Sequence, residues 1–232
     1  DAVLMFLVMD GIEGRLLDEG IARRSGMLGA LGQGVAGLTF GIMDDVERSE
    51  CTAEVLEAYD AAIEGLRALG AETRVFSSPR RYRDLTSDCG RLIAAEGYHH
   101  HGHLYDQPQL PMDEDVRQRM LAGKGMTAAQ YMSILEARAE MRARYLAEMA
   151  GLDAVLTPTI TTAAPRVEEV DQAVSPALFT RHVNHLEMCA MAVPTALTGA
   201  GLPTSLQVIA RGTDEAMAIR VAAAIEAMQP RL

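Results

Sequence analysis

The feature that most constrains the fold of this 232-residue chain is an alternation of short β-rich segments with longer segments of helical periodicity. A β-rich run at 37–42 precedes a segment at 50–69 whose apolar residues recur every three or four positions. Glu54 near its start and Gly70 after its end suit the dipole and the C-cap of a helix. With a second β-rich run at 73–76, this unit predicts parallel strands joined by a right-handed crossover, and therefore an α/β fold. The expected buried face of the helix is Val55, Tyr59, Ile63, Leu66 and Leu69.

The remaining segments continue this alternation without a visible linker or internal repeat, so we expect residues 1–232 to form a single domain or an incomplete one. Thr127 and Gln130 match a capping box at the start of a long helix. Thr213 is the predicted cap of the last helix. The expected buried face of that helix is Met217, Val221, Ala224 and Met228. The other expected helices are 1–9, 87–97, 113–123 and 127–149, the expected strands are 153–157, 190–196 and 205–210, and loops are expected at 98–112 and 159–174.

Composition and charge argue against several classes of function. The net charge of −11 disfavours non-specific binding of nucleic acid, because neutralising phosphates requires clustered Lys and Arg. Cys51, Cys89 and Cys189 are odd in number and widely spaced, which disfavours a disulfide framework and favours a reducing cytoplasm. No apolar run approaches the roughly 20 residues that cross a bilayer. The apolar start lacks the basic flank of a signal peptide, so we expect a cytoplasmic protein that does not bind membranes.

A series of short motifs follows in fixed order between residues 126 and 228. They are Ala128-Ala-Gln-Tyr131, Asp153-Ala-Val-Leu-Thr-Pro-Thr159, Ala163-Ala-Pro165, Phe179-Thr180 with Asn184, Ala192-Val-Pro194, Gly201-Leu-Pro203 and Leu206-Gln-Val-Ile209. Each motif is weak alone, but their order resembles the carboxy-terminal region of the amidase-signature family. The segments 37–42, 68–72 and 97–99 are similar to family segments as well, so the resemblance covers nearly the whole chain.

This resemblance implies a mixed β-sheet covered by helices and the hydrolysis of a non-peptide amide bond. In the family, a serine nucleophile acts through a second serine, in an unusual cis peptide, and a neutral lysine base. Two segments depart from the family pattern. The family's Gly-x-Pro-Ala-x-Ser-x-Pro run reads Glu-Met-Cys-Ala-Met-Ala-Val-Pro at 187–194, and Thr204-Ser205 replaces the commoner Val-Gly. We expect these departures to affect the shape of the substrate site more than the fold.

The chain has poor candidates for the catalytic groups that the resemblance implies. Lys124 is its only lysine and lies in a polar turn between predicted helices. Ser77-Ser78 is its only adjacent serine pair, and no glycine-rich loop that could supply an oxyanion hole surrounds it. A serine hydroxyl needs a nearby base, and lysine serves as one only with a depressed pKa. We therefore expect no catalytic residue in this chain, which alone should be inactive, and place the catalytic portion before Asp1 or in a partner chain.

Binding residues are expected in the loops that leave the predicted strands, where α/β proteins usually bind ligands. The alternative for the loop after residue 157 is that its prolines only stop the strand and stiffen the connection. By the resemblance, the expected substrate-binding residues are Thr159, Phe179, Thr180 and Asn184.

Two groups of histidines raise the question of a metal site, because neutral imidazoles are good ligands for zinc and nickel. Residues 99–103 read His-His-His-Gly-His, but adjacent histidines on a helix point in different directions. We expect a polar surface there and no bound metal. For His182 and His185, near Glu187, we expect packing or pocket lining. No cofactor is expected.

Two functions from different classes remain open. The first is the carboxy-terminal part of a carbon–nitrogen hydrolase that acts on a small-molecule amide. The alternative is a non-catalytic binding or assembly subunit with an amidase-like fold, whose partner chain carries the active centre. The departure at 182–194 argues against the type of amidotransferase subunit that acts on glutamine and misacylated tRNA. An exposed apolar sheet edge would permit association of the chain with itself.

Overall fold

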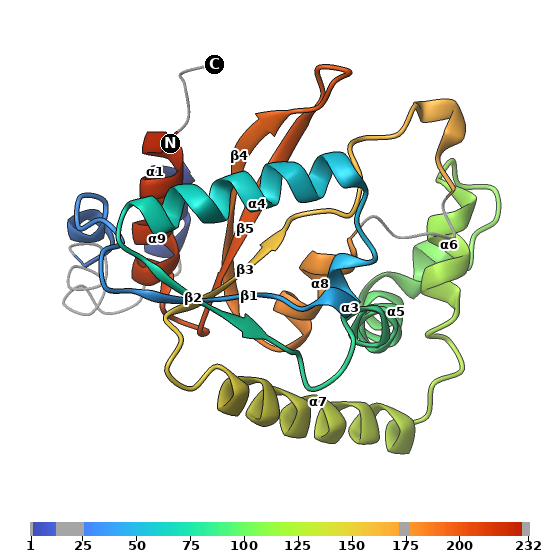
Figure 1. The fold of residues 1–232 in the computed structure, drawn as a ribbon. Helices are drawn as coiled ribbons and strands as arrows, with labels where there is room; N and C mark the ends of the chain where they lie inside the picture. The colour runs from blue at the N-terminus through green and yellow to red at the C-terminus, as the bar shows by residue number, and fades with distance from the viewer. Residues whose placement is uncertain (1, 13–25, 172–176, 229–232) are drawn as a thin grey trace. The chain divides into compact units, whose positions relative to one another are not determined.

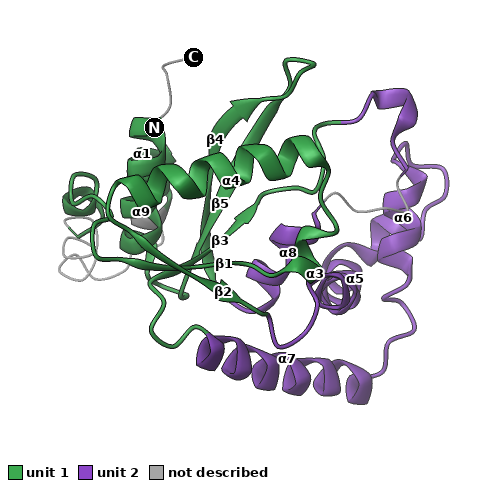
Figure 2. Ribbon diagram, viewed as in Figure 1, with its two compact units in different colours: residues 1–77, 149–164, 188–232 green, residues 78–148, 165–187 purple. Residues whose placement is uncertain are grey.

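A computed structural model describes residues 2–12, 26–171 and 177–228 of the chain (Figure 1). The chain divides into two compact units (Figure 2). Unit 1 consists of residues 1–77, 149–164 and 188–232, and unit 2 consists of residues 78–148 and 165–187. Each unit is therefore built from segments that are distant in sequence. The expectation of a single domain, complete or incomplete, stays a prediction.

Unit 1 contains a mixed five-stranded sheet in the order β2-β1-β3-β5-β4. Strand β1 pairs in parallel with β2 and with β3, whereas β5 runs antiparallel to both β3 and β4. The predicted α/β fold with a mixed sheet is confirmed, as is the parallel pairing across the first crossover. The strands are β1 (Thr39–Met43), β2 (Glu72–Phe76), β3 (Ala154–Pro158), β4 (Cys189–Leu197) and β5 (Pro203–Ala210).

Helices α4 and α9 lie side by side on this sheet, α4 against β3, β4 and β5 and α9 against β4 and β5 (Figure 1). Helix α4 buries most of the face that was predicted for it. Leu69 is the exception: it is 46% exposed, because the helix ends at Ala68 and the chain turns at Gly70 with a φ of 90°. Glycine adopts such a φ without a steric cost. Helices of unit 1 include α1 (Ala2–Ile12), α3 (Asp45–Arg48), α4 (Ala53–Ala68) and α9 (Glu215–Met228), and residues 26–30 are helical as well.

Two predictions about α9 are wrong. The cap is Asp214 rather than Thr213, because the Asp214 carboxylate accepts a hydrogen bond from the Met217 amide at 3.2 Å, whereas Thr213 is exposed with a φ of 70°. The buried face is rotated from the predicted one, and only Val221 is common to both. The residues that α9 buries are Ala218, Ile219, Val221, Ala222 and Ile225.

Unit 2 is helical in its described part. Its helices are α5 (Tyr82–Tyr105), α6 (Glu114–Leu121), α7 (Ala128–Glu148) and α8 (Leu178–His185), with a short 3₁₀ turn, η1 (Val167–Glu169). The predicted capping box is confirmed: the Thr127 amide donates to the Gln130 side chain at 2.9 Å, and the Gln130 amide donates to the Thr127 hydroxyl at 3.3 Å. Helix α5 is longer than predicted at both ends, so the histidines at 99–103 lie within a helix and not in a loop.

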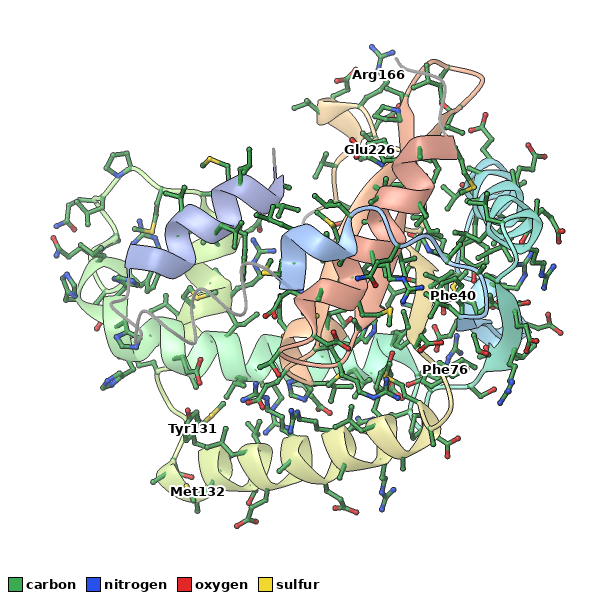
Figure 3. The ribbon with its side chains drawn as sticks, turned by 90° about the vertical axis from the view of Figure 1, so that its left-hand side faces the viewer. Phe40, Phe76, Tyr131, Met132, Arg166 and Glu226 are labelled. Atoms are coloured by element: carbon green, nitrogen blue, oxygen red, sulfur yellow. The ribbon has the colours of Figure 1, made fainter. Side chains whose placement is uncertain are left out.

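Three buried aromatic side chains, Tyr82, Tyr145 and Phe179, lie in the core of unit 2. Tyr82 of α5 packs edge to face on Phe179 of α8, with 5.8 Å between ring centroids. Tyr145 of α7 is fully buried, and its hydroxyl lies 3.5 Å from that of Tyr82. At the other end of α7, Tyr131 points towards α5, where its hydroxyl bonds to Glu96 at 2.9 Å, and Met132 points away (Figure 3). Packing between α5, α7 and α8 therefore holds this unit together.

Candidate functional site

The carboxyl edge of the sheet in unit 1 carries a group of hydroxyl-bearing side chains. Strands β1, β2 and β3 are parallel, so their carboxyl ends share one edge, and the antiparallel β5 begins at that edge. The Ser205 hydroxyl donates to the Thr159 hydroxyl at 2.7 Å, and the Thr159 amide donates to the Ser205 carbonyl at 3.1 Å. Deeper in the sheet, the side-chain amide of Gln207 donates to the Thr157 hydroxyl at 3.0 Å. Polar groups at this edge are thus fixed in place by hydrogen bonds.

The turn between β4 and β5 lies at the same edge of the sheet. The Thr204 hydroxyl donates to the Ala196 carbonyl across the hairpin at 3.0 Å. The Gly199 amide in the turn donates to the carboxylate of Glu54, near the start of α4, at 3.1 Å. Hydroxyls therefore gather where β3 ends, which is the usual position of a ligand site in an α/β protein, and the Glu54 carboxylate holds the nearby hairpin turn.

The four predicted substrate-binding residues lie in different surroundings. Thr159 is one of the hydroxyl-bearing residues at the sheet edge of unit 1, and the other three lie on α8 in unit 2. Phe179 is fully buried in the aromatic core, the Thr180 hydroxyl donates to the Ala177 carbonyl at 3.3 Å, and Asn184 is exposed. Phe179 therefore has a packing role, and the contact of all four with a substrate stays a prediction.

Ser205 and Gln207 are polar residues of this edge that were not predicted as part of a site. Their partners Thr159 and Thr157 lie about fifty positions earlier in the chain, and they meet only through the antiparallel register that places Thr157 opposite Gln207. A register between distant strands leaves no local pattern in the sequence. The only available signal was the replacement of Val-Gly by Thr204-Ser205.

The two histidines of α8 are buried, His182 as a packing residue and His185 in the wall of a cavity of about 370 Å³. His182 is fully buried and stacks on Tyr82 with 3.9 Å between ring centroids, and burial lowers its pKa to about 3. Burial also lowers the pKa of His185, and the positive charge of Arg138 adds to the effect. Both imidazoles are therefore neutral at physiological pH.

Lys124 occupies a surface turn of unit 2. Its ammonium group bonds to the Asp106 carboxylate at 2.7 Å, lies 5.8 Å from the centre of the Tyr98 ring, and belongs to a side chain that is 57% exposed. The hydrogen bonds with Asp106 and Tyr98 raise the pKa of Lys124. No serine occurs among the described residues that line the open cavity of about 690 Å³ next to it.

The serine pair at the end of β2 differs in exposure. Ser77 is exposed, whereas the Ser78 hydroxyl is buried and has no hydrogen-bond partner among the described residues. The side chains of His99, His100, His101 and His103 are exposed on α5. In the described part of the chain, no three His, Cys, Asp or Glu residues are grouped so that they could hold a metal ion. None of the described helices is both long and apolar enough to cross a membrane.

Comparison with known proteins identifies what this fold resembles. The family model described as Amidase matches residues 23–219. A glutamyl-tRNA(Gln) amidotransferase of Acidobacterium capsulatum contains a subunit that is 29% identical over 226 residues, which cover 86% of this chain and 48% of that protein. The chain thus spans about half the length of the curated relatives that it matches.

Solved structures of similar fold lead to the same family. The crystal structure of an amidase matches with a TM-score of 0.75 and 25% identity, over 85% of this chain and 47% of that one. A bacterial aryl acylamidase of the amidase-signature family matches with a TM-score of 0.70 and 18% identity, over 87% of this chain and 45% of that one. Because the family model covers most of the sequence, this chain belongs to the Amidase family.

Proposed function

We propose that this chain is the carboxy-terminal part of a carbon–nitrogen hydrolase that cleaves a non-peptide amide by Ser-Ser-Lys chemistry, with the catalytic residues outside the chain. Membership of the Amidase family supports the reaction class. The geometry of Lys124 is the observation that carries the placement of the catalytic residues. It is the only lysine of the chain, and it is held on the surface by a carboxylate.

Catalysis by a lysine base depends on the protonation state of its amine. A lysine acts as a general base only when it is neutral, and burial or a neighbouring positive charge is what lowers its pKa towards 7. Lys124 has the opposite surroundings, because Asp106 and Tyr98 both stabilise its charged form and raise its pKa. It therefore remains an ammonium group at neutral pH and cannot take a proton from serine.

In this proposal the chain contributes the wall of the substrate site and not its chemistry. The hydroxyl pair Thr159–Ser205 lies at the sheet edge where ligands usually bind, and it is held by two hydrogen bonds. Thr159 in unit 1 and, separately, Thr180 and Asn184 in unit 2 are candidates for contact with a small amide.

The test is an assay of the purified 232-residue chain and of its Lys124→Met variant with acetamide and benzamide. We expect no hydrolysis above the uncatalysed rate by either protein, together with native near-ultraviolet dichroism. Hydrolysis by the unmodified chain that is lost in Lys124→Met would contradict the placement of the catalytic groups. Arg144→Met, which removes an exposed, ion-paired positive charge elsewhere in unit 2, serves as the matched control.

A second candidate function is suggested by the names of the relatives. The curated relatives that match at 28–29% identity are subunits of glutamyl-tRNA(Gln) amidotransferases. That similarity favours a partner chain for this protein, whether its role is like that of an amidotransferase subunit or is confined to assembly. The coding sequence before Asp1 separates the readings, since a continuous frame with a glycine-rich Ser-Ser motif supports the hydrolase and a stop codon supports the non-catalytic assembly role.

Location and association are part of the same proposal. We place the protein in the cytoplasm because its three cysteines are free thiols, and we propose that it associates with a partner chain or with itself. Cell fractionation tests the first statement. Size-exclusion chromatography with light scattering tests the second, and a monomer at all concentrations, alone and in cell extract, would contradict it.

A further inference from the structure

Unit 2 contains a cavity of about 760 Å³ whose wall carries three arginines. Arg91 comes from α5, Arg119 from α6 and Arg181 from α8. The turn that joins α6 to α7 closes one side. Three helices therefore each bring one arginine to the same cavity, although the arginines are 28 to 90 positions apart in the sequence.

These arginines have no acidic partner in the described part of the chain. Many other arginines do: Arg48 pairs with Asp60 at 2.8 Å, and Arg138 pairs with Glu187 at 3.1 Å. None of the described residues that line the cavity is Asp or Glu. The chain has 32 acidic residues against 21 basic ones, so carboxylates are plentiful elsewhere on it. A wall that is only positive is therefore a local feature and not the consequence of a basic protein.

One side of the wall is fixed by a close backbone contact. Gly123 in the turn packs so closely on α5 that a Cβ atom there would lie 2.1 Å from the Ala94 carbonyl oxygen. Gly90 leaves room on α5, where a Cβ atom would lie 3.7 Å from an Nη1 atom of Arg181. Gly123 thus permits the close approach of the turn to α5, and the distance at Gly90 places the Arg181 guanidinium next to α5. A pre-formed cavity loses little entropy when it binds a ligand.

The rest of the wall is largely apolar. Ile93, Val116, Met120 and Met126 line it, and Ile93 is 43% exposed although it is a large aliphatic residue. Methionine side chains adapt to ligands of varied shape because they are flexible and polarisable. An apolar wall of this volume with a few convergent polar groups is typical of a small-molecule site.

We infer that this cavity binds a small organic anion, whose carboxylate or phosphate lies against Arg91, Arg119 and Arg181 and whose apolar part contacts Met120 and Met126. Guanidinium groups bind both oxyanions through paired N–H donors, and such charge-assisted bonds are among the strong hydrogen bonds of proteins. The size of the hollow favours a compact ligand over an acidic polypeptide, which would need a longer groove. The inference concerns binding alone and stands independently of the hydrolase proposal.

The test measures binding to the 232-residue chain by calorimetry at low salt, with phenyl phosphate, benzoate and the neutral benzyl alcohol as probes. We expect both anions to bind at least tenfold more tightly than benzyl alcohol, and the better of the two identifies the oxyanion. Arg181→Gln and Arg91→Gln should each weaken binding of that anion about tenfold, the loss expected for one charge-assisted bond. Arg74→Gln on β2 is the matched control, because it removes an exposed arginine outside the cavity and should change the affinity less than about twofold.

Three results would overturn the inference. Equal affinities for benzoate, phenyl phosphate and benzyl alcohol would show that the arginines recognise no anion. An equal loss of anion affinity in Arg74→Gln and Arg181→Gln would show that the loss follows from the change of net charge and not from the cavity. Tighter binding of a ten-residue polyglutamate than of either small anion would assign the wall to an acidic polypeptide. Thermal unfolding of each variant, measured alongside, identifies any variant that fails to fold, and Arg91→Lys then replaces it as a milder change of the donor geometry.

Discussion

Replacing His182 with phenylalanine tests how a buried imidazole sets the acid stability of unit 2. The ring is fully buried and stacked on Tyr82, and neither of its nitrogens makes a hydrogen bond of ordinary geometry with the described residues. Burial lowers its pKa from 6.5 to about 3, while the nearby Leu178 carbonyl opposes that shift and His185 adds slightly to it. Phenylalanine preserves the stacked ring and removes the titrating group.

The magnitude follows from the two pKa values. Between pH 6.5 and about pH 3 the unfolded chain binds a proton on His182 that the folded chain does not. The free energy of unfolding therefore falls by about 1.4 kcal/mol for each pH unit in this window. From pH 7 to pH 5 the loss due to His182 is about 2 kcal/mol. The stability is complete above pH 6.5 and is lost as the pH falls towards 3.

The assay is urea unfolding at pH 7 and at pH 5, followed by tyrosine fluorescence. Of the six tyrosines, only Tyr59 lies outside unit 2, so the signal reports mainly on this unit. Between pH 7 and pH 5 the free energy of unfolding of the unmodified chain should fall by about 2 kcal/mol more than that of His182→Phe. His101→Phe, at an exposed position of α5, should keep the original pH dependence. An equal loss in His182→Phe and in the unmodified chain would refute the reasoning.

Three further substitutions test the packing. Tyr59→Phe removes a buried hydroxyl that bonds to Met43 and Leu156 at 3.0 Å, and urea unfolding should show a loss of about 1–3 kcal/mol, against less than about 0.5 kcal/mol for the exposed Tyr131→Phe. Gly123→Ala places a Cβ atom against the backbone of α5 and should cost about 1–3 kcal/mol or more, whereas Gly125→Ala, with open space around it, should cost little; similar losses would contradict the close contact. Glu187→Gly relieves a positive φ but removes two ion pairs, so the unfolding free energy should change by less than about 1 kcal/mol, and a loss above about 2 kcal/mol would show that the ion pairs dominate.

Local patterns predicted the sheet and α4 well, and they failed where the outcome depends on contacts with distant residues. The strands are framed by glycines and prolines, and α4 carries its own apolar stripe, so both follow from nearby residues. Helix α5 continues through Gly97 and Gly102 because each glycine packs against a side chain, Met120 and Tyr98 respectively. Because glycine has a low helix propensity, the sequence alone favours a helix that breaks at these two glycines.

The candidate sites were less predictable than the fold for a related reason. Thr159 was expected near a ligand because it follows a strand, but its bond to Ser205 depends on the register between two strands that are distant in the sequence. The three arginines of the cavity in unit 2 lie on three different helices, and each one alone is an ordinary surface residue. Sites assembled from several elements require the packing of those elements to be known first.

The residues that depart from the family pattern make interactions of their own within the fold. Glu187 has a φ of 55°, a conformation that glycine adopts more easily, and its carboxylate pairs with Arg138 at 3.1 Å and with Arg142 at 3.4 Å. Two half-exposed pairs of this kind offset a strain of about 1 kcal/mol. Thr204 and Ser205 each use the added hydroxyl in a hydrogen bond. Because the bond of Ser205 holds Thr159 at the carboxyl edge, this departure adds a hydroxyl pair to the predicted substrate wall.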